Sequence, residues 1–133
     1  MTATARHLTV REVTEIAGLA FGTGRPELRA PGLLESAVHR PRARMFGVSA
    51  HQDLYEQSAA LLHAIAVNHP FVDGNKRTAW LAAVTFLALN GADLADADQD
   101  TAYDLVVDVA SGAVDDLAAI AGRLRVLAAP SVS

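Results

Sequence analysis

Two stretches of helical length in the middle of the chain are apolar around most of their circumference. The first runs over 54–68, and the second runs from Gly74 or Asn75 to Asn90-Gly91, a pair typical of a helix end. A helix without a polar face has to be surrounded by the rest of the protein. Because only residues 68–73 join the two stretches, we expect an antiparallel helix hairpin at the centre of the fold.

Composition supports an all-α fold. Alanine and leucine are strong helix formers and account for 27 and 16 of the 133 residues. With 51% hydrophobic and 20% charged residues, the chain is expected to form a compact helical bundle, a single domain over 1–133 with one core. The absence of cysteine excludes disulfides, thiolate metal sites and thiol catalysis.

Local signals predict about six helices. Thr9 and Glu12 have the spacing of a capping box, Asp53 caps the first central helix, and Asp115 or Asp116 caps the last. An acidic loop over 93–100 precedes the fifth. The predicted helices lie over 10–20, about 33–38, 54–68, about 75–89, 101–111 and 117–127.

The segment over 40–49 has no helical period and contains a glycine that permits a tight turn, so we expect an exposed loop or a small hairpin. Arg40, Arg42 and Arg44 alternate along it, and alternate side chains of an extended chain point the same way. These arginines either form a solvated surface or contact an acidic partner or nucleotide phosphates.

Charge and hydropathy argue against nucleic-acid and membrane partners. The 11 basic and 15 acidic residues give a net charge of −4, which does not favour nonspecific binding to nucleic acid. The longest apolar run, 79–89, is well short of the roughly 20 residues that span a bilayer. Residues 1–7 do not have the pattern of a signal or transit peptide. We therefore expect a cytoplasmic protein.

The connection between the two central stretches carries the candidate site. It reads His-Pro-Phe-Val-Asp-Gly-Asn-Lys-Arg-Thr over 69–78. A helix that begins here offers unpaired backbone N–H groups and a positive dipole end, which together bind anions. Gly74 lets a ligand approach the backbone, and Lys76 and Arg77 add positive charge, so a phosphate chain is the favoured ligand.

Two further side chains in this segment suit chemistry on phosphates. The carboxylate of Asp73 is a hard oxygen ligand suited to Mg²⁺ beside a phosphate chain. The imidazole of His69 can accept the proton of an incoming hydroxyl. Positioning, charge neutralisation and a base are what phosphoryl or nucleotidyl transfer requires.

The segment resembles the signature of the Fic/Doc family, His-x-Phe-x-(Asp/Glu)-Gly-Asn-x-Arg, and meets all seven specified positions. Gly-Leu-Leu-Glu-Ser-Ala-Val over 32–38 is similar to the Doc branch in particular. So are Arg40-Pro41, Phe46-Gly47 and the hairpin that ends at Asn90-Gly91. The resemblance covers about 9–112 and implies a compact helical bundle of the Fic/Doc type.

The resemblance also implies roles for the residues of the segment. His69 corresponds to the base that deprotonates a target hydroxyl, and Asp73 to the Mg²⁺ ligand. Gly74, Asn75, Lys76 and Arg77 correspond to the cradle for the ATP phosphates, with Arg77 counted among the catalytic residues as well. Residues 42–49 occupy the place of the hairpin flap that holds the target segment in an extended form.

Two positions depart from the pattern of AMP-transferring Fic enzymes, Gly-Asn-Gly-Arg-x-x-Arg. Lys76 stands at the second glycine and Trp80 at the second arginine. The lysine is the Doc pattern, which implies a kinase-like toxin that transfers the γ-phosphate of ATP. The resemblance further implies a threonine of elongation factor Tu as the target, an arrest of translation and growth, and neutralisation by a partner antitoxin of Phd-like type.

Other interpretations stay open. AMP transfer is the alternative reaction, disfavoured by Lys76 and Trp80. A catalytically inactive module that only binds an antitoxin is disfavoured by the complete residue set of the motif. Among ordinary roles, Asp73 can cap the following helix, His63 is expected in the core or at its edge, and Phe71 and Trp80 are expected to be core anchors.

Overall fold

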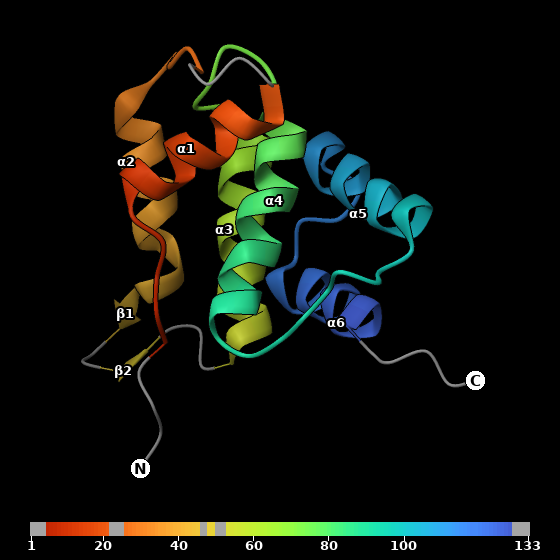
Figure 1. Ribbon diagram of the computed structural model, residues 1–133. Helices are drawn as coiled ribbons and strands as arrows, with labels where there is room; N and C mark the ends of the chain where they lie inside the picture. The colour runs from red at the N-terminus through yellow and green to blue at the C-terminus, as the bar shows by residue number, and fades with distance from the viewer. Residues whose placement is uncertain (1–4, 22–25, 46–47, 50–52, 129–133) are drawn as a thin grey trace.

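The structure is a computed structural model that describes residues 5–21, 26–45, 48–49 and 53–128 (Figure 1). Within these residues it contains six α-helices, one short 3-10 helix and a pair of two-residue strands, so the predicted all-α fold is confirmed. The elements are α1 (Val10–Phe21), α2 (Pro31–His39), η1 (Arg40–Arg42), β1 (Arg44–Met45), β2 (Val48–Ser49), α3 (Leu54–Asn68), α4 (Asn75–Leu89), α5 (Gln99–Ser111) and α6 (Leu117–Ala128).

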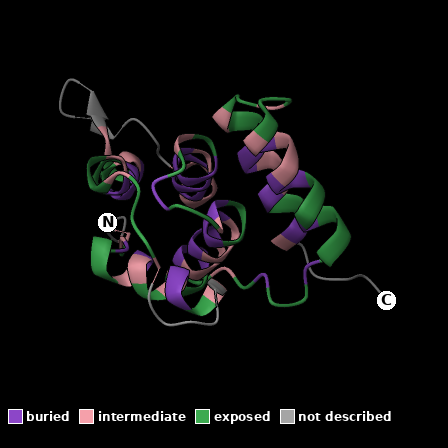
Figure 2. Ribbon diagram, turned by 90° about the horizontal axis from the view of Figure 1, so that it is seen from above, coloured by how far each residue is buried: buried purple, intermediate pink, exposed green. Residues whose placement is uncertain are grey.

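The two apolar helices α3 and α4 form the centre of the molecule, as predicted. Figure 1 shows them side by side, with α1 and α2 on one flank and α5 and α6 on the other. Nine of the fifteen residues of α3 and seven of the fifteen residues of α4 are buried, and Figure 2 shows purple segments along the helices at the centre of the molecule. The hydroxyl of Ser58 donates to the carbonyl of Ala83 at 3.0 Å and satisfies a polar group between the two helices.

Side-chain caps fix where the helices begin. Glu12 N–H donates to Thr9 Oγ1 while Glu12 Oε1 accepts from Thr9 N–H, which confirms the reciprocal capping box. Asp53 accepts from the Glu56 N–H. Of the two candidate caps for the last helix, Asp116 is the one that accepts a backbone N–H, that of Ala119. The fifth helix begins two residues earlier than predicted because Asp98 is its cap.

The region over 40–49 forms the small hairpin that was expected, with Arg44 opposite Ser49 and Met45 opposite Val48. The expectation that its arginines lie along an extended chain is wrong for Arg40 and Arg42. Both belong to the 3-10 turn η1, and their side chains point to different partners. Arg40 Nη1 lies 2.8 Å from His63 Nδ1, and Arg42 Nη2 donates to the Leu8 carbonyl at 3.5 Å. The predicted flap over 42–49 includes residues 46–47, which lie outside the described part of the chain.

None of the described helices is both long and apolar enough to cross a lipid bilayer.

Candidate active site

His69 occupies an unusual backbone position between the two central helices. Helix α3 ends at Asn68, and His69 follows as its C-cap with φ 51° and ψ 62°, in the left-handed region. A residue with a Cβ loses about 1–2 kcal/mol in this conformation. Pro70 comes next, and a proline disfavours helical backbone in the residue before it. Surrounding contacts therefore hold the backbone of His69 in place.

Phe71 anchors the connection between α3 and α4 in the core, as predicted. Its ring is fully buried in the core, and its backbone pairs with the side chain of Asn75. Asn75 Nδ2 donates to the Phe71 carbonyl at 2.9 Å, and Asn75 Oδ1 accepts the Phe71 N–H at 3.0 Å. One of the two N–H donors of this amide is thus used inside the protein, and its second N–H and the backbone N–H of Asn75 remain for the predicted phosphate cradle.

The turn into α4 is made by Asp73 and Gly74. Gly74 is the N-cap, with φ 73°, and Asp73 Oδ1 accepts the Gly74 N–H at 2.8 Å. The interpretation of Asp73 as the cap of this helix is wrong, because its carboxylate turns back onto the adjacent amide instead of reaching the first turn. Asp73 is exposed, and no described residue bonds its other oxygen.

The first turn of α4 presents the groups that were predicted to bind anions. The first intrahelical hydrogen bond runs from the Thr78 N–H to the Gly74 carbonyl, so the N–H groups of residues 75–77 have no acceptor in the helix. Lys76 is exposed with no hydrogen-bonding or ionic partner among the described residues. Arg77 Nη1 donates to the carbonyl of Ala20 at 3.2 Å, which ties α4 to the end of α1.

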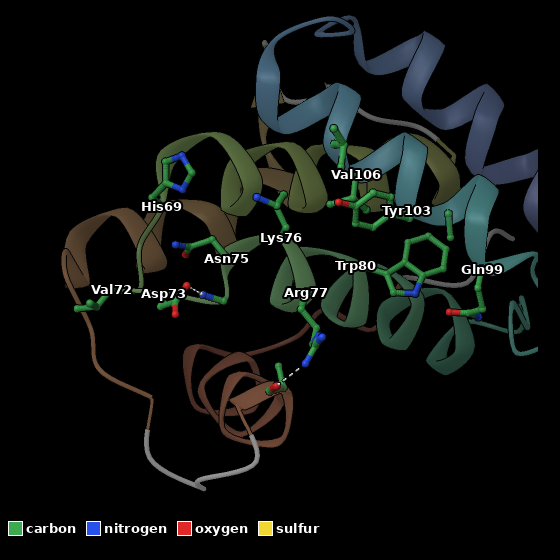
Figure 3. A pocket seen from close by; sticks show the side chains of 14 residues that line it. His69, Val72, Asp73, Asn75, Lys76, Arg77, Trp80, Gln99, Tyr103 and Val106 are labelled. Atoms are coloured by element: carbon green, nitrogen blue, oxygen red, sulfur yellow. Dashed lines mark hydrogen bonds between the residues drawn. The ribbon is translucent and has the colours of Figure 1, made fainter.

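A cavity of about 720 Å³ opens over this turn and is large enough for a nucleotide. Figure 3 shows His69 and Trp80 at its two ends, with Lys76 between them. The lining includes all six residues predicted for the site. It comprises Ala20, His69, Val72, Asp73, Gly74, Asn75, Lys76, Arg77, Trp80, Gln99, Ala102, Tyr103, Val106 and Val107.

The model of the Fic/DOC family matches residues 7–87 of the chain. The chain belongs to the Fic/Doc family. It is 48% identical over 124 residues to "Toxin Doc" of Mycolicibacterium smegmatis, which covers 92% of this chain and 94% of that protein. It is also 35% identical over 122 residues to "Protein kinase doc" of Escherichia phage P1, which covers 90% of this chain and 94% of the phage protein.

The far end of the cavity in this Fic/Doc protein contains residues that the motif does not include. Trp80 packs against the core, as predicted, but it is only partly buried and also lines the cavity, while Tyr103 and Gln99 reach the cavity from α5. Tyr103 is 66% exposed. An aromatic side chain on the polar face of a helix was the available signal for Tyr103, but only the packing of α5 beside α4 brings it to the site.

The other described histidines of the Fic/Doc chain stay away from the cavity. His63 is half-buried beside Arg40, and burial followed by the arginine charge lowers its pKa, with Asp115 opposing. His7 stacks on Phe86 at 5.7 Å, and burial, with Arg42, lowers its pKa too. Of the histidines in the described ranges, His69 alone lines the cavity.

The donor set fits the Mg²⁺ expected in a Fic/Doc site that binds phosphates. The described residues contain no cluster of three histidine, aspartate or glutamate side chains that would hold a metal ion unaided. Mg²⁺ is commonly bound by one or two carboxylates together with substrate phosphates. Asp73 provides one carboxylate at the edge of the predicted phosphate cradle, so the arrangement suits an ion that would arrive with a nucleotide.

Proposed function

We propose that this Fic/Doc protein is a Doc-type toxin that transfers the γ-phosphate of ATP to a hydroxyl side chain of a protein. The proposal is carried by one observation: a single cavity places His69, the open carboxylate oxygen of Asp73 and the start of α4 together. These groups supply a base, a metal ligand and an anion site. Phosphoryl transfer depends on positioning and charge stabilisation of this kind.

In the proposed reaction, the backbone N–H groups of residues 75–77 and the ammonium of Lys76 bind the phosphate oxygens. Asp73 would hold Mg²⁺, and the ion would neutralise negative charge on the phosphates. His69 takes the proton of the acceptor hydroxyl as its oxygen forms a bond to the γ-phosphorus. The bond from that phosphorus to the β–γ bridging oxygen breaks, and ADP leaves.

The shape of the cavity favours the γ-phosphate over AMP as the transferred group. Trp80 and Tyr103 offer flat aromatic surfaces to a nucleobase at the end far from His69. A nucleotide with its base there and its phosphates over Lys76 directs the γ-phosphate toward His69. In AMP transfer the α-phosphate would have to take that place.

The protein partners are proposed from the resemblance to Doc-type toxins. We assign a threonine of elongation factor Tu as the acceptor and a Phd-like antitoxin as the inhibitor. The relatives named "Toxin Doc" and "Protein kinase doc" support a toxin with kinase activity. Val72, which is 57% exposed at the cavity, provides an apolar contact for a protein ligand.

Mass spectrometry of the acceptor tests the proposal. The purified chain is incubated with elongation factor Tu, ATP and Mg²⁺, and with the His69→Ala variant in parallel. An added phosphate that depends on His69 supports the kinase assignment, whereas an added AMP establishes the alternative reaction. An unmodified acceptor, with ATP left intact, contradicts the proposed function.

A further inference from the structure

A short extended segment before α2 lies along the connection that carries His69. Leu28 and Phe71 form an antiparallel bridge, and the N–H of Val72 donates to the carbonyl of Glu27 at 2.9 Å. The N–H groups of Arg29 and Ala30 both donate to the Pro70 carbonyl, at 2.8 and 3.1 Å. These backbone bonds fix residues 70–72 but do not reach the carbonyls of the two residues before Pro70.

The side chain of Arg29 reaches those two carbonyls. Its Nε donates to the carbonyl of His69 and its Nη2 to the carbonyl of Asn68, both at 2.7 Å. Carbonyls at the end of a helix lack intrahelical donors and carry the negative end of the helix dipole, so a cation is favoured there. The planar guanidinium presents its donors in a fixed fork, which suits two successive carbonyls.

The contact matters because His69 is in the left-handed region, with a proline after it. The left-handed conformation is unfavourable for a residue with a Cβ and persists only where the surroundings impose it. The orientation of the peptide groups on either side of His69 sets the direction of its Cα–Cβ bond. Arg29 holds the carbonyl of each of these two peptide groups.

We propose that Arg29 is a positioning residue that fixes the backbone of His69 and thereby aims its imidazole into the cavity. Arg29 is not among the residues that line the cavity, so it acts through His69 and not on a ligand. The kinetic consequence rests on the proposed function, whereas the effect on the backbone of His69 does not depend on it.

The first test compares Arg29→Gln and Arg29→Lys with Arg11→Gln. Arg11 is an exposed arginine on α1 that pairs with Glu15 and serves as the matched control. We expect Arg29→Gln to lower kcat for phosphate transfer by about 100-fold, the effect of a small misplacement of a catalytic group. The KM for ATP should change less than about twofold, because the substitution does not touch the phosphate cradle or the aromatic residues Trp80 and Tyr103. Arg29→Lys keeps the positive charge but cannot reproduce the fork, so its kcat should lie between that of Arg29→Gln and that of the wild type.

Chemical rescue distinguishes positioning from general support of the fold. Arg29 is exposed, so a small cation can reach the space left in Arg29→Ala. Millimolar methylguanidinium should raise kcat of Arg29→Ala and leave the His69→Ala variant inactive. If methylguanidinium raised kcat of both Arg29→Ala and His69→Ala, or of neither, the assignment would be contradicted.

NMR provides a readout without activity. A strong intraresidue N–H to Hα Overhauser effect at His69 marks positive φ in the wild type and should weaken in Arg29→Gln and Arg29→Ala while Arg11→Gln retains it. An unchanged signal at His69, or a wild-type kcat in Arg29→Gln, overturns the inference. If the wild type transfers nothing to any acceptor, the proposed function fails, and the NMR comparison still decides the role of Arg29.

Discussion

The side-chain amide of Asn75 forms two hydrogen bonds with the backbone of Phe71, four residues earlier, and so closes the connection between the two central helices into a tight loop. Asn75 is 8% exposed and Phe71 is fully buried, so water cannot replace either bond. The position that the family pattern assigns to phosphate binding therefore also maintains the shape of the site. A change at this position is expected to affect stability as well as activity.

Asn75→Ala should lower the free energy of unfolding by about 2–4 kcal/mol, because it leaves the buried N–H and carbonyl of Phe71 unpaired. Asn75→Asp, which keeps an acceptor for the N–H but no donor for the carbonyl, should also destabilise. Urea denaturation followed by circular dichroism measures both values. A loss below about 0.5 kcal/mol for Asn75→Ala would show that the loop does not depend on this amide.

His69→Asn should strongly reduce transfer and preserve the fold. Asparagine tolerates the left-handed conformation better than most residues, so the backbone at φ 51° can be kept while the base is lost. We expect a loss of about 10²- to 10⁴-fold in kcat, the usual contribution of a general base. His39→Asn, an exposed histidine at the end of α2 and outside the cavity, is the control. Comparable activity in the two variants would remove His69 from the mechanism.

Asp73→Asn should separate the metal role of this side chain from its structural one. The amide oxygen of asparagine can still accept the Gly74 N–H, so the turn into α4 is retained. The lost negative charge weakens binding of Mg²⁺. The measurement is kcat against Mg²⁺ concentration, and the expected result is a higher half-saturating concentration with an unchanged melting temperature. An identical Mg²⁺ dependence would contradict the metal assignment.

Stability should fall as the pH falls from about 7 to 5, because the pKa values of His63 and His7 are both lowered from the usual 6.5. The folded state then binds fewer protons than the unfolded chain in this window, so acid favours unfolding. The lowered pKa values of Glu12 and Asp98 act at more acidic pH. His63→Gln should flatten the dependence of the unfolding free energy on pH. A slope equal to that of the wild type would mean that His63 does not contribute.

The sequence was most informative where local chemistry decides the structure. The helical spacing of apolar residues and caps such as Thr9 and Asp53 located the six helices to within a few residues. The motif over 69–78 also placed the residues of one cavity together, because they are neighbours along the chain. Local signals of this kind need no knowledge of distant contacts.

What the sequence did not reveal depends on contacts between distant segments or on single backbone angles. The left-handed turn at Gly74 displaced Asp73 from the cap, and η1 turned Arg40 toward α3. Arg29 meets His69 forty residues away, and Tyr103 reaches the cavity from another helix. A pattern of neighbouring residues does not encode these tertiary relationships.

Trp80 offers a direct measurement of where the base of the nucleotide binds. It is the single tryptophan of the chain, and it lines the cavity at the end opposite His69. If the base lies there, ATP with Mg²⁺ should change the tryptophan fluorescence, whereas inorganic triphosphate should bind the start of α4 with a much smaller change. Trp80→Leu should then raise the KM for ATP by about 5- to 150-fold, the loss of about 1–3 kcal/mol of base stacking. Equal fluorescence changes with ATP and triphosphate would place the base elsewhere, and the cavity shape would then no longer favour the γ-phosphate over AMP.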